Sequence, residues 1–435
     1  MTDTPLKSSS LRQLASGFRG RTLKTAKIAS KAGVSMATRA LGVPKRSSSR
    51  STDKAHLLLQ EMNELKGLIM KFGQMASYLE GALPPEAQAI LSELQANSTP
   101  LDWSVVRGEV ERGLGAPVED CFESFDTTPF AAASIGQVHR ARVDGVDVAV
   151  KVQYPGIADA LRSDLDTLGS LARLALTVGP LDGRSLVAEL RGRMLEECDY
   201  IREAENQRLF SQLLTNVDGA RVPNILASHS SKTVLTSELD SGMSLKDATS
   251  QLDQNTLNRV AAVIFESCFR CLFQFAVFNG DPHPGNYLVH PNGDVTFLDF
   301  GCVRRFEVDF IDRWKLLANI IMKGDRDAFP DAFRALGWIA TERGYDWESS
   351  WQSLKYLYRP FLSTEPFTYT NEYVLESYQR LIVKNPNKFK TTMPPEWLLL
   401  NRLQWGLNSV FSQLRATGQW GDLWIPIINT PTEPR

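Results

Sequence analysis

Two stretches of the chain alternate apolar and polar residues on either side of a short turn signal. The first runs over 137–153 and is divided by Asp144-Gly145, and the second, 286–301, is divided by Asn292-Gly293. Alternation with a period of two is typical of β-strands, and Asp-Gly or Asn-Gly pairs favour the tight turn between two paired strands. The pattern therefore predicts two β-hairpins.

Most of the remaining chain has the spacing of apolar residues that is typical of helices. This spacing predicts helices in 55–97, a smaller helical and turn segment in 100–128, and two or three helices in 157–215. A region of short strands follows at 222–242, with a connecting segment near 238–243, and the rest is mostly helical. The order predicts an α+β protein with a helical extension, a small β-lobe with inserted helices and a helical lobe.

The length and the amino-acid composition of the chain are those expected of a protein with two lobes of ordinary size. The 435 residues are 43% hydrophobic and 23% charged, and no stretch reaches the roughly 18 consecutive apolar residues of a transmembrane helix. Five scattered cysteines argue against a disulfide framework and fit a reducing compartment. Cys268 and Cys271 form a Cys-x-x-Cys pair inside an apolar helical pattern, so we expect them in a core helix. We likewise expect the Trp and Phe residues of 306–435 in the core.

The first 54 residues differ from the rest in charge. They hold twelve Lys and Arg against Asp3 and Asp53, so this segment carries about +10 although the whole chain carries −2. Leu11, Leu14 and Phe18 fall at helical spacing within it. Three interpretations stay open: a basic amphipathic segment that touches anionic lipid, a mitochondrial transit peptide, or a solvated flexible tail.

Lys151 is the first residue with a candidate chemical role. It ends the alternating run VAVK, after a loop of small residues and a hairpin. Phosphoryl transfer needs a fixed cation on the α- and β-phosphates of a nucleotide, oriented by a carboxylate on a neighbouring helix. Glu203, in YIREAEN about 50 residues further on, is the natural partner for that cation.

The segments FNGDPHPGNYLV and FLDFG supply the acidic and amide groups. Asp281 and Asn286 are five positions apart, the spacing at which kinases place a catalytic aspartate and a metal-binding asparagine. Asp299 precedes Phe-Gly and is suited to hold Mg²⁺ against the phosphates. Together with Lys151 and Glu203, these residues predict a kinase-like fold, with Asp281 as catalytic base and Asn286 and Asp299 as metal ligands.

Two departures from ordinary kinases change what we expect of this site. The nucleotide-covering loop, AAASIGQVH, has alanines where glycines are expected, so its approach to the phosphates should change. The catalytic loop lacks the arginine of His-Arg-Asp, which argues against control by a phosphorylated activation loop. His283 instead follows the aspartate, as in many kinases of small molecules. The nucleotide-site candidates from the loop and the lobe connection are Ala131, Ala132, Ala133, Ser134, Gly136, Gln137 and Glu238.

At these motifs the sequence resembles the UbiB (AarF-like) family of atypical kinase-like proteins, which is associated with ubiquinone (coenzyme Q) biosynthesis. The resemblance runs from about residue 66 to at least residue 340 and includes KFGQ, AAASIGQVHRA, VAVKVQYPG, ECDYIREA, GDPHPGN and LDFG. It implies a two-lobed atypical protein-kinase-like fold with an N-terminal helical extension across the active site. The divisions expected are a basic flexible tail in 1–54, the extension in 55–128, a kinase-like N-lobe with inserted helices in 129–240 and a helical C-lobe in 241–435.

The resemblance also implies roles for individual residues. Lys71 and Gln74 would lie over the nucleotide pocket, and Glu197 and Asp199 would interact with the extension. ATP or ADP and Mg²⁺ would be the cofactors. The extension and the alanine-rich loop are thought to block protein substrates and to favour ATP hydrolysis, and better studied members act at membranes and bind lipid-like quinone precursors.

The leading hypothesis is a Mg²⁺-dependent, ATP-binding atypical kinase or ATPase that supports ubiquinone biosynthesis at a membrane surface. Two alternatives stay open, a small-molecule phosphotransferase suggested by GDPHPGN and a nucleotide-gated scaffold without chemistry. Expected partners are the nucleotide, a lipid or quinone precursor, an anionic membrane surface and other quinone-biosynthesis proteins, but no nucleic acid. The expected location is the cytoplasm, peripheral on the inner membrane, with the mitochondrial matrix as the alternative.

Overall fold

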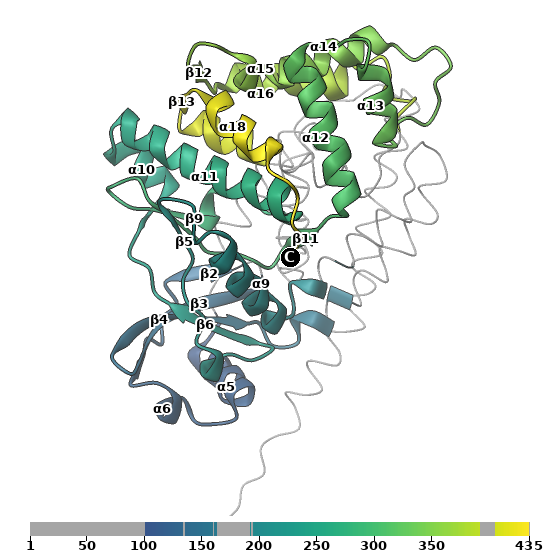
Figure 1. Ribbon diagram of the computed structural model, residues 1–435. Helices are drawn as coiled ribbons and strands as arrows, with labels where there is room; N and C mark the ends of the chain where they lie inside the picture. The colour runs from purple at the N-terminus through teal and green to yellow at the C-terminus, as the bar shows by residue number, and fades with distance from the viewer. Residues whose placement is uncertain are drawn as a thin grey trace, which may run out of the picture. The chain divides into compact units, whose positions relative to one another are not determined.

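The structure is a computed structural model that describes residues 101–133, 135–159, 161–162, 192, 195–391 and 405–434 (Figure 1). The expected tail, the extension up to residue 100 with Lys71 and Gln74, Ser134 and most of the expected inserted helices lie outside the described residues. The chain divides into two compact units. The larger comprises Val110–Thr127, His139–Lys151 and Asp199–Arg435, and the smaller comprises Met1–Glu109, Thr128–Val138 and Val152–Cys198.

The first predicted hairpin is confirmed. Strands β3 (Gly136–Val143) and β4 (Val146–Gln153) are neighbours in a sheet with the order β1-β3-β4-β6, where β1 is Ser124–Phe125 and β6 is Val234–Glu238. Asp144 and Gly145 connect them with φ angles of 49° and 76°. Left-handed backbone at both central positions matches the turn type whose twist suits paired strands, so the Asp-Gly pair fixes the register of β4.

The second predicted hairpin is confirmed as well. Strand β9 (Tyr287–Val289) pairs antiparallel with β10 (Val295–Phe297), and Gly293 in their turn has a φ of 86°. These strands lie in a sheet with the order β5-β10-β9-β7, where β5 is Ala220–Arg221 and β7 is Met243–Ser244. A separate antiparallel pair joins β8 (Val277–Asn279) to β11 (Val303–Arg305). This pairing brings the segment before Asp281 beside the segment that follows Asp299.

Helices begin at side chains that cap them. Helix α9 (Tyr200–Leu213) starts where Asp199 accepts hydrogen bonds from the N–H groups of Ile201 and Arg202, and α11 (Gln254–Phe275) starts in the same way at Asp253. Such caps satisfy backbone donors that have no partner inside the helix. The expected helical segment near 100–128 contains α5 (Trp103–Leu114) and α6 (Val118–Cys121), and a short 3-10 turn, η2 (Ala227–His229), precedes β6.

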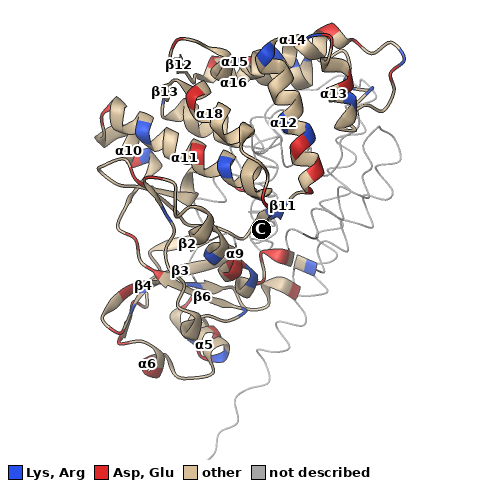
Figure 2. Ribbon diagram, viewed as in Figure 1, with Lys and Arg blue, Asp and Glu red and all other residues tan. Residues whose placement is uncertain are grey.

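The C-terminal part of the larger unit is mostly helical, as expected. Figure 1 shows α18 alongside α11, with α12 near both. Charges of both signs are interspersed along α12 (Figure 2). Asp309 and Arg313 form an ion pair on this helix. The elements are α10 (Leu245–Gln251), α12 (Val308–Lys323), α13 (Phe329–Ala335), α14 (Trp347–Leu357), α15 (Arg359–Leu362), β12 (Phe367–Thr368), α16 (Asn371–Tyr378), the π-helix η4 (Gln379–Val383), β13 (Thr417–Gly418) and α18 (Trp420–Asn429).

The core of this region forms between α11 and α18 from large aromatic side chains. Trp420 and Trp424 are both buried, and the Trp424 ring stacks on Phe361 with centroids 4.5 Å apart. Cys268 and Cys271 lie buried in α11 as free thiols, which confirms the core-helix expectation, and burial raises the pKa of Cys268 to about 12. Within the described residues, no helix has both the length and the apolar character needed to cross a membrane.

Candidate active site

Lys151 and Glu203 form a buried ion pair between β4 and α9. Lys151 Nζ lies 2.7 Å from Glu203 Oε1, and the two side chains are 18% and 3% exposed. Burial by itself lowers the pKa of Lys151, but the negative charges of Glu203 and Asp299 outweigh burial and raise that pKa well above its usual value. The ammonium also lies 5.0 Å from the centre of the Tyr200 ring. The lysine is therefore a fixed, permanently charged cation.

One face of α9 connects this ion pair to the Asp299-Phe300-Gly301 turn. Glu203, Asn206 and Phe210 are spaced three and four positions apart, which places them along one side of a helix. Asn206 Nδ2 donates to the carbonyl of Phe300 at 3.0 Å, and the rings of Phe210 and Phe300 lie 5.1 Å apart. A single helix thus orients Lys151 and holds the turn that carries Asp299.

The segment from Asp281 to Asn286 is a rigid turn whose ends meet. Asn286 Nδ2 donates to the backbone carbonyl of Asp281 at 2.9 Å and to its carboxylate at 3.3 Å. Residues Pro284–Asn286 form the 3-10 turn η3, and the imidazole Nδ1 of His283 accepts the N–H of Gly285 at 3.0 Å. His283 therefore caps the turn that sets the distance between the aspartate and the asparagine.

Asn279 links that turn to Asp299. Its Nδ2 donates to the backbone carbonyl of Asp299 at 2.5 Å, while its Oδ1 accepts the N–H of Asp281 at 3.4 Å. Asp299 Oδ1 in turn accepts the N–H of Gly301 at 2.9 Å. The structure thus brings Lys151, Glu203, Asp281, Asn286 and Asp299 together around α9, β4 and the two turns.

The donor atoms of this cluster fit a magnesium ion. Because Asn286 uses its amide nitrogen on Asp281, its amide oxygen is the atom available to a cation, and Asp299 offers carboxylate oxygen. Hard oxygen ligands of this kind suit Mg²⁺, which proteins usually hold with one or two side chains together with substrate phosphates. The described part of the chain contains no group of three His, Cys, Asp or Glu residues that could hold a metal ion.

The alanine-rich loop is a short paired strand in the smaller unit. Strand β2 (Ala131–Ala133) pairs antiparallel with the start of β3, Ala133 facing Gly136. Ala131 and Ala132 are exposed, so their methyl groups lie on the surface of this hairpin. Gln137 is buried, and its Oε1 accepts the N–H of Leu101 at 2.9 Å. Its side-chain oxygen is thus engaged inside the protein.

The other expected nucleotide-site residues have structural contacts of their own. Glu238 ends β6, and its Oε2 accepts from Asn224 Nδ2 at 3.0 Å. Glu197 is largely buried in the turn before α9, whereas Asp199 caps that helix. The expected contacts of Glu197 and Asp199 with the extension remain predictions because Lys71 and Gln74 lie outside the described residues.

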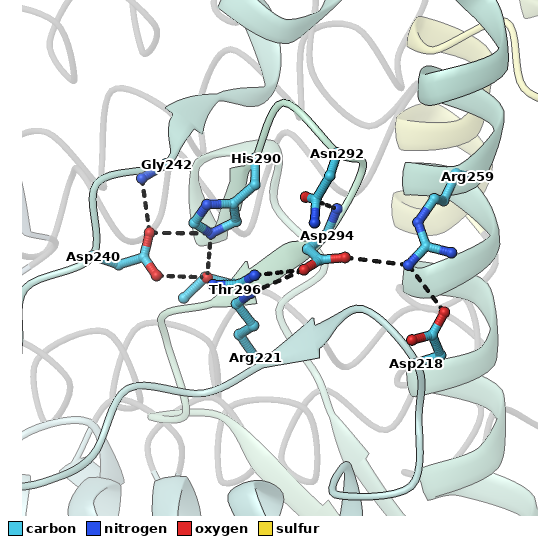
Figure 3. Close-up of polar contacts among 9 residues, drawn as sticks. All are labelled: Asp218, Arg221, Asp240, Gly242, Arg259, His290, Asn292, Asp294 and Thr296. Carbon is cyan, nitrogen blue, oxygen red and sulfur yellow. Dashed lines mark hydrogen bonds and ion pairs between the residues drawn. The ribbon is translucent and has the colours of Figure 1, made fainter.

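A second polar cluster stabilises the strands that follow the turn between Asp281 and Asn286 (Figure 3). His290 Nε2 lies 3.0 Å from Thr296 Oγ1 and 3.3 Å from Asp240 Oδ1. The Thr296 hydroxyl donates to Asp240 Oδ2 at 2.8 Å, and Gly242 N–H donates to Asp240 Oδ1 at 2.7 Å. These contacts join the end of β9 to β10 and to the connection between β6 and β7, so they fix the hairpin that begins at Asn286.

Asp294 lies beside that cluster between two arginines (Figure 3). Its Oδ2 lies 2.5 Å from Arg221 Nη2, and its Oδ1 lies 3.2 Å from Arg259 Nη2. Burial raises the pKa of this carboxyl, but hydrogen bonds with Arg221, Asn292 and Arg259 outweigh burial and lower the pKa to about 2. The pair of arginines therefore keeps Asp294 ionised.

Residues 93–331 match the ABC1 atypical kinase-like domain, which is more than half of the chain. The chain belongs to this family of atypical kinases, the ABC1 or UbiB family. The family match confirms the kinase-like α+β fold that the order of the motifs predicts.

Two curated relatives and one solved structure are similar to this ABC1 family member. The mitochondrial atypical kinase coq-8 of Caenorhabditis elegans is 29% identical over 399 residues, which cover 88% of this chain and 52% of the relative. The probable protein kinase UbiB of Aeromonas hydrophila subsp. hydrophila is 31% identical over 289 residues, which cover 64% of this chain and 52% of the relative. The chain thus spans about half the length of these curated relatives.

The solved structure is the complex of Rv3197 with erythromycin from Mycobacterium tuberculosis. It has a TM-score of 0.64 and 26% sequence identity, and the similarity covers 89% of this ABC1 family member and 100% of that chain. The likeness supports the same kinase-like fold.

Three further residues shape the site of this family member, and the sequence patterns described above do not indicate them. Asn206 donates to the carbonyl of Phe300, Asn279 donates to the carbonyl of Asp299, and Gly406 lies against Pro282 of the turn between Asp281 and Asn286. A side-chain carbon added at Gly406 would overlap with Pro282 Cγ. Asn279 could have been noted as the residue two positions before Asp281, but Gly406 is too distant along the chain for any local pattern to indicate it.

Proposed function

We propose that this chain binds ATP with Mg²⁺ and acts as an atypical kinase or ATPase that supports ubiquinone biosynthesis at a membrane surface. The buried ion pair between Lys151 and Glu203, with the charge of Asp299 acting on the same ammonium, carries this proposal. Membership of the ABC1 family supports it, because relatives are named as atypical kinases. The basic residues of 1–54 support a membrane location, since Lys and Arg attract anionic lipid.

Lys151 would neutralise phosphate oxygens of the nucleotide. Glu203 holds the ammonium at 2.7 Å, so the cation is oriented before the nucleotide binds and needs no reorganisation. Its raised pKa keeps it charged at neutral pH. Asn286 and Asp299 would hold Mg²⁺, which supplies the positive charge that offsets the charge of the phosphates.

Asp281 would act on the attacking group. Its carboxylate is oriented by Asn286 Nδ2 at 3.3 Å, and the turn capped by His283 fixes its backbone. The oxygen of a hydroxyl or a water molecule would form the new bond to the γ-phosphorus while the bond to the β,γ-bridging oxygen breaks and ADP leaves. The proton of the attacking group would pass to the Asp281 carboxylate.

The variant Asp299→Asn tests the metal and nucleotide assignment. The substitution keeps the side-chain size and the acceptor for Gly301 N–H but removes the charge. We therefore expect the gain in ATP affinity on adding Mg²⁺ to be at least about tenfold smaller than in the wild type. Titration calorimetry with and without Mg²⁺ measures this, and Asp309→Asn on the surface of α12 is the matched control. Unchanged Mg²⁺-dependent affinity and ATPase rate in Asp299→Asn would show that the metal assignment is wrong.

The variant Asp281→Asn distinguishes an enzyme from a nucleotide-gated scaffold. If the chain acts as an enzyme, this variant should bind nucleotide but fail to restore the quinone content of cells that lack the protein. Restoration equal to the wild type would favour a nucleotide-gated scaffold instead.

A small-molecule phosphotransferase is the second candidate. The similar chain from Mycobacterium tuberculosis was solved with erythromycin, so a protein of this fold accommodates a small organic ligand. This candidate predicts a phosphorylated metabolite whose formation depends on Asp281, detected by mass spectrometry of a metabolite extract incubated with γ-labelled ATP. Release of labelled free phosphate without any labelled metabolite would count against it.

A further inference from the structure

Phe389 is an aromatic side chain that the fold leaves in solvent. It is 70% exposed, the largest exposed fraction among the large hydrophobic side chains of the described residues. Val383, at the end of η4, is 53% exposed nearby in the sequence. Single exposed apolar residues are common, so exposure alone does not indicate a function. The support beneath Phe389 and the charges beside it distinguish this segment.

A buried asparagine holds the loop that presents Phe389. Asn387 is fully buried, and its Nδ2 donates to the carbonyl of Asp346 at 2.7 Å and to Ser350 Oγ at 3.0 Å. Its Oδ1 accepts the N–H of Asp346 at 2.9 Å. The carbonyl of Lys390 accepts the N–H of Ala340 at 2.8 Å, which fixes the other side of Phe389. The ring is therefore displayed on a rigid support at no further cost in ordering the loop on binding.

Basic residues lie on both sides of Phe389 in the sequence. Lys388 Nζ lies 5.3 Å from the centre of the Phe389 ring, Lys384 is exposed, and Lys390 Nζ donates to the carbonyl of Gly344. Within the described residues, no carboxylate is paired with these three ammonium groups. The nearest acidic positions along the supporting segment are already engaged: Glu342 pairs with Arg334, and Asp346 accepts the N–H of Ser349.

We propose that a surface of this segment docks onto a membrane of anionic phospholipid. This surface, the Phe389 surface, consists of Val383, Lys384, Lys388, Phe389 and Lys390. An aromatic ring can enter the boundary between headgroups and acyl chains while flanking lysines meet the phosphates. Lysine is depleted from interfaces between proteins, which argues against a protein partner for a surface that holds three of them. The segment 379–391 contains no acidic residue, although the whole chain has a net charge of −2, so its charge is complementary to that of an anionic bilayer.

This inference rests on the proposed membrane location but not on the proposed nucleotide chemistry, because none of its residues belongs to the active site. It assigns the contact to the helical part of the chain and makes it separable from any contact by the basic segment 1–54. Measurements on the full chain can therefore distinguish the two.

Sedimentation of the full chain with phosphatidylcholine vesicles, with and without phosphatidylglycerol, gives the first test. We expect binding to require phosphatidylglycerol and to weaken about tenfold in Phe389→Ser and in Lys384→Glu/Lys388→Glu. Leu316→Ser is the matched control, because Leu316 is a 52% exposed leucine on α12, and it should bind like the wild type. Phe389→Ser binding as tightly as Leu316→Ser would overturn the proposal.

An environment-sensitive dye gives the second, local test. Phe389→Cys and Leu316→Cys, each in a Cys121→Ser background, carry the dye, since the other native cysteines are buried. We expect a blue shift of the dye emission on anionic vesicles at position 389 and none at 316. Sedimentation without a shift at 389 overturns the Phe389 surface but leaves the membrane location standing. Absence of any sedimentation overturns both, while the nucleotide chemistry is judged by Asp299→Asn alone. An equal shift on neutral vesicles overturns the role given to the lysines.

Discussion

Lys151 Nζ and Glu203 Oε1 lie 2.7 Å apart across 52 positions of sequence, and both side chains are largely buried. The same helix that carries Glu203 also donates from Asn206 to the carbonyl of Phe300. The charge that would meet the phosphates and the turn that would hold the metal are therefore positioned by one element. Any motion of α9 would displace both together.

Two variants of this ion pair should distinguish its contribution to stability from its contribution to nucleotide binding. Lys151→Met removes the ammonium that pairs with buried Glu203, which we expect to destabilise the fold by up to about 3–5 kcal/mol and to weaken ATP binding at least about tenfold. Lys151→Met/Glu203→Leu removes both charges, so it should regain much of the stability without regaining ATP affinity. Chemical denaturation and calorimetry measure the two quantities, with Lys246→Met on the surface of α10 as control. Recovery of ATP binding in the double variant would contradict the role given to Lys151.

His283 should affect turnover through the turn that it caps. Its Nδ1 accepts the N–H of Gly285, so His283→Ala removes the cap between Asp281 and Asn286. We expect kcat to fall several-fold, KM for ATP to change little and stability to drop by about 1 kcal/mol. His283→Asn keeps a side-chain acceptor near the same N–H and should retain most of the kcat. Steady-state ATPase assays compare the two, and equal kcat values in the Ala and Asn variants would exclude a capping role.

Gly406 and Gly108 should respond to the same substitution with opposite signs. Alanine in a helix is favoured over glycine by about 0.5–1 kcal/mol, and an added carbon at Gly108 in α5 meets no atom within 4 Å, so Gly108→Ala should stabilise the protein. At Gly406 the added carbon overlaps with Pro282, so Gly406→Ala should lower both the melting temperature and the ATPase rate. If Gly406→Ala raises the melting temperature and keeps wild-type activity, the turn adapts to the added carbon and the prediction is wrong.

Asp294 should contribute stability that is lost in acid. Its folded pKa of about 2 lies below the unfolded value of about 3.9, so its contribution is complete above pH 4 and disappears as the pH falls towards 2. Because Arg221 and Arg259 are about half exposed, solvent screening limits the contribution to about 1–2 kcal/mol. The free energy of unfolding of the wild type minus that of Asp294→Asn should therefore shrink between pH 5 and pH 2.5 by about two thirds of that amount. A pH-independent difference for Asp294→Asn would contradict the assignment.

The sequence could predict those residues for which a turn or a reaction allows few alternatives. Asp144-Gly145 indicates its hairpin because few residues adopt the left-handed backbone of that turn, and Lys151, Asp281 and Asp299 are required by phosphoryl transfer itself. Asn279 was not predicted, because an asparagine that bonds to the backbone has no fixed position in any motif. Contact between Pro282 and Gly406 is created by tertiary folding and leaves no periodicity in the chain. Local patterns therefore predict residues of restricted chemistry better than the residues that support them.

The contact between Gly406 and Pro282 also bears on how such a protein can be recombined. The ABC1 domain match ends at residue 331, whereas Gly406 lies beyond it. A chimera that joins the matched domain of one relative to the C-terminal residues of another would keep every motif and still place a foreign backbone against Pro282. A recombined chain would therefore need its C-terminal residues and its turn between Asp281 and Asn286 to come from the same relative.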